Sequence, residues 1–166
     1  LEDIAPKIPG LDEAFEKSGR MENATFEQLL ESLDESAQAL IAGDAQHAAD
    51  TFRISELILP DIGKPDFGRW TLHVIRGERL AVKKRFDLAR ADFNRARGPD
   101  GTLTAEAHVS LGRVFRDEEN YDAALAEFGT VTPEARDDFP IARYWIAQVH
   151  VMRFKKTKET ADLKTA

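Results

Sequence analysis

The sequence predicts an all-α protein built from repeated helical hairpins. Helix-forming residues dominate the 166-residue chain, and the Val/Ile/Thr alternation that is typical of strands is scarce. Residues 70–97 and 105–132 resemble each other at a constant offset of 35 residues. A constant offset over several helical turns indicates a repeated supersecondary unit. The length suits one compact domain or one short array of repeats with a buried core.

The residues shared by the two copies explain why each unit should be a helical hairpin. Small residues allow the two helices of one unit to approach closely, and aromatic residues fill the space beside them. The pairs, each 35 residues apart, are Gly77 and Gly112, Ala89 and Ala124, Phe86 and Tyr121, and Phe93 and Phe128.

The second copy resembles the tetratricopeptide repeat. The positions where that family has Leu-Gly, an aromatic, a second aromatic, Ala and a third aromatic are occupied by Leu111-Gly112, Phe115, Tyr121, Ala124 and Phe128. The resemblance implies a right-handed α-solenoid of about three tetratricopeptide-like hairpins plus a C-terminal capping helix. It also implies a scaffold for another protein or peptide, with no catalytic chemistry and no cofactor.

Residues 1–24 are predicted to form an N-terminal arm that packs on the first repeat. Leu11–Lys17 allows about two helical turns before Gly19 ends them. Thr25-Phe26-Glu27-Gln28 is typical of a capping box that starts the next helix. The arm is too apolar for a purely solvated tail, through Ile4, Ile8, Leu11 and Phe15. We expect it to fold back onto the first helix of the first hairpin, as a cap or as an occupant of the groove.

The solenoid is predicted to span residues 25–155. In the first hairpin, one helix with an apolar stripe ends before Gly43, and the second, which contains Ala48 and Phe52, ends at Pro60. From Ala48 to Ala89 is 41 residues, so about six extra residues form a loop within 61–69.

The later units have clearer boundaries. The second hairpin is predicted at residues 70–97 and the third at 104–131. Asp137-Asp138 suits a helix start, and the last strong helix is predicted at residues 141–154. Residues 156–166 are expected to be a capping helix or a tail.

Charge is distributed unevenly along the chain. The net charge is −7, which argues for solubility and against nucleic acid as the main partner. Residues 67–97 nevertheless carry nine Lys and Arg against three acids. This stretch is either a solvated face or an anchor for an acidic partner segment. The predicted basic patch is Arg76, Arg79, Lys83 and Lys84.

The sequence offers little support for catalysis or metal binding. It contains no P-loop, no G-x-G-x-x-G and no G-x-S-x-G motif. It has no cysteine, and no two histidines lie four residues apart, so a zinc site has little support. His73 and His108 share one position of the repeat, which favours a structural role. No apolar run approaches the roughly 20 residues needed to cross a membrane, and both the cytoplasm and a bacterial periplasm are compatible.

The resemblance also implies which residues face a partner, because the first helices of successive hairpins line a concave groove in such arrays. Carried over, the groove residues are Leu33, Ala37, Val74, Glu78, Val82, Val109, Arg113, Arg116, Tyr144, Gln148 and Met152. The Lys and Asn residues with which some members of the family grip a peptide C-terminus are absent. An apolar groove with a few charges suits a helix or an apolar extended peptide.

Three classes of function therefore stay open. The favoured one is a non-enzymatic protein-protein interaction scaffold that holds a partner segment in its groove. The alternative is an assembly or self-association module of a larger secretion, envelope or organelle machine. The weakest is an enzyme, which would require a deep pocket with convergent titratable groups.

Overall fold

The computed structural model is mainly helical and describes residues 11–63 and 67–157, with only the backbone described for 11–24 and for 157. The elements are α1 (Leu11–Ala42), α2 (Ala45–Ile58), the 3-10 helix η1 (Leu59–Ile62), α3 (Arg69–Val82), α4 (Phe86–Phe93), α5 (Ala105–Asp117), α6 (Tyr121–Gly129), the 3-10 helix η2 (Pro133–Ala135) and α7 (Asp138–Thr157). Within these residues there is no strand beyond an isolated bridge between Arg97 and Leu103. The predicted all-α class is confirmed.

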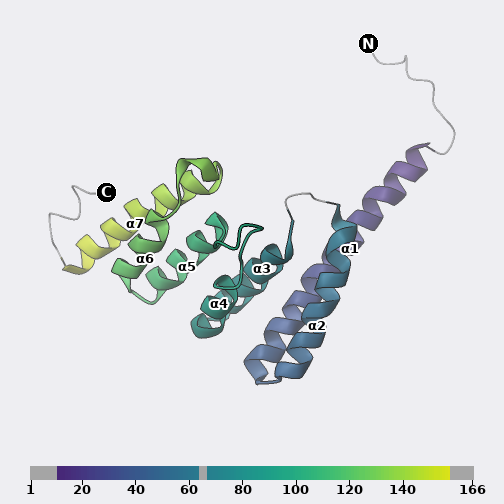
Figure 1. The fold of residues 1–166 in the computed structure, drawn as a ribbon, viewed down its shortest axis with the longest axis horizontal. Helices are drawn as coiled ribbons and strands as arrows, with labels where there is room; N and C mark the ends of the chain where they lie inside the picture. The colour runs from purple at the N-terminus through teal and green to yellow at the C-terminus, as the bar shows by residue number, and fades with distance from the viewer. Residues whose placement is uncertain (1–10, 64–66, 158–166) are drawn as a thin grey trace, which may run out of the picture.

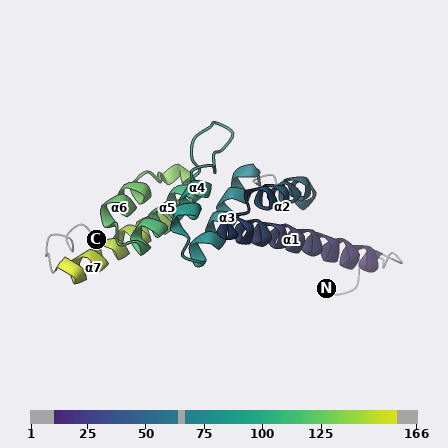
Figure 2. The ribbon, with the colours of Figure 1, turned by 90° about the horizontal axis from the view of Figure 1, so that it is seen from below.

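The helices pair into hairpins that follow one another along the long axis of the molecule (Figure 1). α1 packs against α2, α3 against α4, and α5 against α6. Neighbouring hairpins meet through α1 and α3, through α3 and α5, and through α5 and α7. In the view of Figure 2, α1, α3 and α7 lie along the lower side of the molecule, and α2 and α6 lie above them.

The second and third hairpins share the same close contact between their helices. A Cβ atom on Gly77 would lie 2.5 Å from Cε1 of Phe93, and one on Gly112 would lie 2.5 Å from Cε1 of Phe128. Both phenylalanines are buried. The absence of a side chain at each glycine is therefore what lets the aromatic ring of the second helix rest on the first.

The turns of these two hairpins are equivalent as well. Lys84 and Glu119, 35 residues apart, both have positive φ, at 57° and 60°. The next amide closes each turn, from Arg85 to the carbonyl of Leu80 at 2.9 Å and from Asn120 to the carbonyl of Phe115 at 2.8 Å. The 35-residue repeat of the sequence is thus a repeat of backbone conformation.

Helix α1 differs from the prediction at its N-terminal end. It runs unbroken from Leu11 to Ala42, so the predicted stop at Gly19 and the predicted start at Thr25 are wrong. An interior glycine costs about 1 kcal/mol relative to alanine, too little to break a helix that good helix formers flank. Since a preceding turn supplies carbonyl partners for the amides after Thr25, no capping box is needed there.

This continuity also changes the predicted arm. Helix α1 crosses the boundary set at residue 24 and extends beyond α2 in Figure 1. Residues 11–20 continue the axis of the helix onto which they were expected to fold back, so that packing does not occur for them. Residues 1–10 and 158–166 lie outside the described residues, and so does most of the predicted C-terminal segment.

The remaining boundaries follow the sequence closely. Thr104 caps α5 through its hydroxyl, which accepts from the amide of Ala107 at 3.2 Å, and Asn120 caps α6 by accepting from Ala123 at 3.3 Å. Helix α7 begins at Asp138, three residues before its predicted start. It includes Pro140 in its first turn, where a missing amide proton removes no helical hydrogen bond.

Candidate functional site

Four of the predicted groove residues do not face an open surface. Leu33, Ala37, Val74 and Val109 are buried, so the prediction that they line a groove is corrected. Ala37 and Val74 belong to one apolar cluster that joins the first hairpin to the next two.

Five other predicted residues do line open hollows. A hollow of about 90 Å³ includes Glu78, Val82 and Arg113, and a hollow of about 550 Å³ includes Val82, Arg116 and Met152. The two share Ala81, Val82 and Asp117, so they adjoin. We call the surface formed by Glu78, Val82, Arg113, Arg116 and Met152 the α3–α5–α7 groove. Tyr144 and Gln148 are not among the residues that line either hollow.

The charged side chains of this groove are held by neighbours on other helices. Glu78 accepts hydrogen bonds from the Ser110 hydroxyl at 2.6 Å and from Nη1 of Arg113 at 3.1 Å. The Arg116 guanidinium lies 4.2 Å from the ring centroid of Trp145. These contacts link α3 to α5 and α5 to α7, so the groove has fixed polar walls.

The predicted basic patch is not one surface. Arg76 is buried, and Arg79 pairs with Asp34 of α1 at 3.0 Å. Lys83 and Lys84 are exposed in the turn after α3. The prediction of one patch is corrected because successive arginines of a helix point in different directions. Arg76 faces the core, and Arg79 faces the preceding hairpin.

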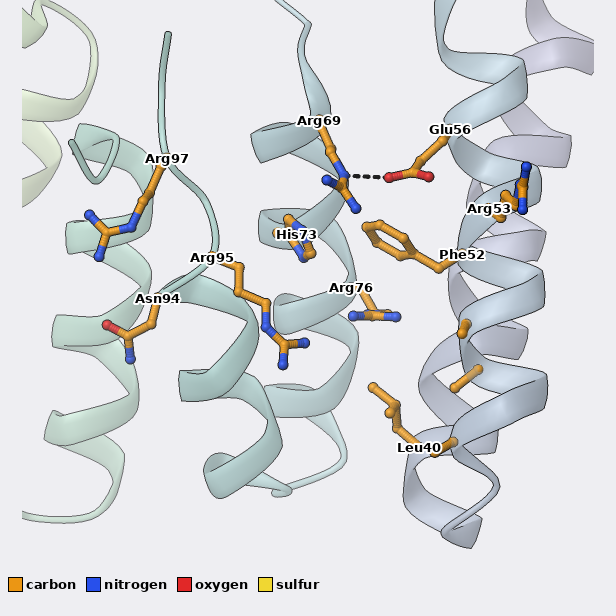
Figure 3. Close-up of a pocket in the computed structure, with 13 residues that line it drawn as sticks. Leu40, Phe52, Arg53, Glu56, Arg69, His73, Arg76, Asn94, Arg95 and Arg97 are labelled. Carbon is orange, nitrogen blue, oxygen red and sulfur yellow. Dashed lines mark ion pairs between the residues drawn. The ribbon is translucent and has the colours of Figure 1, made fainter. Parts of the chain in front are cut away.

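The structure gathers a different set of arginines between the first and second hairpins. Helix α2 makes fewer contacts with α3 than α4 makes with α5 or α6 with α7. A cleft of about 780 Å³ lies at this junction (Figure 3). Its charged and aromatic lining residues are Phe52, Arg53, Glu56, Arg69, His73, Arg76, Arg95 and Arg97. We call it the arginine cleft.

A buried polar cluster forms the floor of the arginine cleft. Arg76 binds both carboxylate oxygens of Asp92, from Nε at 2.7 Å and from Nη2 at 2.6 Å, and donates from Nη1 to the Ser36 hydroxyl at 2.8 Å. Nδ1 of His73 lies 3.2 Å from Oδ1 of Asp92. The ring of Phe52 stacks on His73 at 4.7 Å and lies 4.2 Å from the Arg76 guanidinium. The cluster therefore joins α1, α2, α3 and α4.

Burial and pairing shift the pKa of Asp92 in opposite directions. Burial alone would raise its pKa, but hydrogen bonds from His73 and Arg76 and the charge of Arg76 outweigh it and lower the pKa below 3.8. Asp92 is therefore ionised at neutral pH and compensates the buried guanidinium. The predicted structural role of His73 fits this packing, and His108 repeats it by pairing with Glu127 at 2.7 Å.

The mouth of the cleft is more accessible and carries more positive charge. Arg69 and Glu56 form an ion pair across it, and in Figure 3 Arg95 points into the cleft toward Arg76. Arg53 of α2 and Arg95 are exposed and have no side-chain partner among the described residues. Arg97 donates to the carbonyl of Gly101 at 3.0 Å.

The sequence reasoning missed Arg53 and did not single out Arg95. A signal was present, since the 41-residue offset between the first two hairpins aligns Phe52 with Phe93 and Arg53 with Asn94. Both positions directly follow the aromatic residue of a second helix. The alignment therefore places Arg53 at the position of Asn94, one residue before Arg95, on the adjacent repeat.

In the described part of the chain, no group of three or more His, Asp or Glu residues is placed to hold a metal ion. Nor does any helix there have the length and apolar character required to cross a membrane. Comparison with protein-family models, with curated proteins and with solved structures found no match.

Proposed function

We propose that this chain is a non-enzymatic scaffold that binds a segment of a partner protein in the α3–α5–α7 groove. The observation that carries the proposal is the convergence of two exposed apolar side chains on one hollow. Val82 of α3 is 80% exposed and Met152 of α7 is 37% exposed, and both line the hollow of about 550 Å³. A single exposed apolar residue is ordinary, whereas two from separate helices in one hollow favour a binding surface.

The internal repeat supports a tetratricopeptide-like α-solenoid as the frame of this scaffold. Gly77 and Gly112 each receive the aromatic ring of the following helix, and Lys84 and Glu119 form equivalent turns. Stacked repeats of this kind create an extended surface along their first helices. In this chain α3, α5 and α7 supply that surface.

The lining of the groove indicates the chemistry of the partner segment. Val82, Phe86 and Met152 offer apolar contact, while the charges of Lys84 and Arg116 at the same hollow are balanced by Asp117 and Glu119. Methionine adapts its shape to different apolar partners. A helix or an extended apolar segment fits this arrangement.

The test of this proposal replaces the two apolar side chains. A photo-crosslinking residue at position 82 identifies the bound protein in the source cell, and its affinity is then measured with purified Val82→Asp and Met152→Asp. Each substitution should weaken binding about tenfold or more, because burying one such side chain contributes about 1.5–3 kcal/mol. Ala126→Asp, at an exposed position on α6, is the control. Equal binding by all three variants would remove the groove from consideration.

A second candidate function, self-association, is favoured by the two ends of the molecule. Ile54 and Leu57, three residues apart on one face of α2, are 48% and 70% exposed. Ile141 and Tyr144, three apart on α7, are 45% and 56% exposed. Helices α2 and α7 lie at opposite ends in Figure 1. We propose that these faces pair head to tail between copies of the chain if it serves as an assembly module.

A further inference from the structure

We propose that the arginine cleft is a second binding site, separate from the α3–α5–α7 groove, and that it binds an acidic peptide segment through its carboxylates. Five arginines and one carboxylate, Glu56, line the cleft, so its lining is strongly positive. Its volume of about 780 Å³ lies within the range of about 300–1,000 Å³ that is usual for ligand sites.

The two sites lie on opposite faces of the same helix. Arg69, His73 and Arg76 of α3 line the arginine cleft, and Glu78 and Val82 of α3 line the groove. At 3.6 residues per turn, positions 76 and 78 point about 160° apart around the helix axis. A partner in one site therefore leaves the other accessible.

The guanidinium groups available to a ligand come from both walls. Arg53 belongs to α2, and Arg95 follows α4, and neither has a side-chain partner within the described residues. A guanidinium presents a planar fork that matches a carboxylate with two parallel hydrogen bonds. One such fork from each wall suits two carboxylates of one extended peptide.

Arg69 adds a third cation that a ligand can engage. Its pairing with Glu56 is exposed on the arginine side, where the side chain is 71% accessible. Replacing Glu56 would leave its buried Oε1 without a partner, so Arg69 contributes through the exposed part of its guanidinium while it stays paired. Arg76 has a different role, because Asp92 already neutralises it and it holds the floor in place.

The remaining features of the cleft favour a peptide over a nucleic acid. Phe52, the aromatic residue of the lining besides His73, is buried and already packs on His73 and Arg76, so it offers no open surface for base stacking. The net charge of −7 also opposes a long polyanion that would run beyond the cleft. A short acidic segment avoids that repulsion.

The experiment measures fluorescence anisotropy with a labelled short peptide of Glu, Asp and Gly, at low and at physiological salt. Arg53→Gln combined with Arg95→Gln should weaken binding of this peptide about tenfold, since it removes two charge-assisted contacts. Arg143→Gln combined with Lys155→Gln changes the net charge equally at exposed positions on α7 and should leave the affinity unchanged. Thermal unfolding of both double variants should match the wild type, because all four residues are exposed.

Four results would overturn the proposal. They are an absence of binding by the wild type, equal weakening by the α7 control, equal binding of a peptide with Gln and Asn in place of the acids, and tighter binding of a single-stranded oligonucleotide through Arg53 and Arg95. Val82→Asp tests the separate groove and should not alter binding of the acidic peptide. A failure of one site is thereby distinguished from a failure of the other.

Discussion

Arg76 occupies the repeat position that Leu111 fills in the third hairpin, and both side chains are buried. A buried guanidinium is costly unless it is paired and hydrogen-bonded, and here Asp92 and Ser36 satisfy it. Phe52 packs on this charged group. The polar junction between the first two hairpins therefore centres on an arginine at a repeat position that is apolar in the third hairpin.

Asp92 provides the first prediction at this scale. Asp92→Asn leaves the Arg76 charge buried without its counter-ion and should lower the free energy of unfolding at neutral pH by about 3–5 kcal/mol. Urea unfolding followed by circular dichroism measures the change. Asp61→Asn, at an exposed carboxylate of η1, is the control and should have little effect. An Asp92→Asn protein as stable as the wild type would show that the cluster contributes nothing.

Asp92 should also make the free energy of unfolding depend on pH. The pKa of Asp92 in the folded chain lies below 3.8, its ordinary value, because of the pairing described above. Its stabilisation is therefore complete above pH 3.8 and is lost as the pH falls through the lower folded pKa. The acid-dependent loss of stability should be smaller in Asp92→Asn than in the wild type.

The sequence alone could not show this cluster. Arg76 belongs to a stretch with nine basic residues, where the usual interpretation is a solvated face. Its partner Asp92 lies 16 residues away on another helix, and Ser36 lies 40 residues away. Aligning Arg76 with Leu111 would have placed it in an apolar position, and that alignment is the signal that was available.

The hairpin is the element that the sequence predicted best. Gly77 and Phe93, like Gly112 and Phe128, are in contact as a close-approach pair, and Ala89 and Ala124 are fully buried. The 35-residue offset was sufficient to predict the hairpins, because the same backbone geometry requires the same small and aromatic residues in each copy.

The glycine contact gives a prediction at the scale of the element. Gly112→Ala places a Cβ 2.5 Å from the buried ring of Phe128. Overpacking of this kind costs about 1–3 kcal/mol, which outweighs the gain in helix propensity of about 1 kcal/mol at most. A Cβ on Gly129 of α6 would meet nothing within 4 Å, so Gly129→Ala should be neutral or slightly stabilising. Melting temperatures compare the two, and a stabilised Gly112→Ala would contradict the close approach.

Longer elements and surfaces were harder to predict. Gly19 was predicted to end a helix, yet α1 continues through it. The low helix propensity of one glycine is outweighed by the helix-forming residues on both sides. Leu33 and Val109 were assigned to a groove, yet they are core residues, because the covering hairpin decides which face of a helix is open. The angle between hairpins decides which face of a helix the neighbouring hairpin covers. The periodicity of one helix carries no information about that angle.

At the scale of the whole molecule, the hairpins are arranged in a row with an apolar face near each end. Such an arrangement differs from a compact globule because its two ends are different surfaces. Contact between unlike ends is heterologous, and it produces chains of molecules unless the rotation closes into a ring. The exposed residues of α2 and α7 make this a testable property.

Sedimentation velocity over a range of protein concentrations measures whether copies of the chain associate. If the α2 face and the α7 face pair head to tail, the wild type should shift to larger species as concentration rises. Leu57→Glu and Tyr144→Glu should each abolish the shift, because each removes one of the two unlike faces. A mixture of the two variants provides the sharper result: each retains the face that the other has lost, so the mixture should form heterodimers through one intact junction and stop there. A wild type that sediments as a monomer at every concentration would exclude self-association and leave the partner-binding scaffold as the function to pursue.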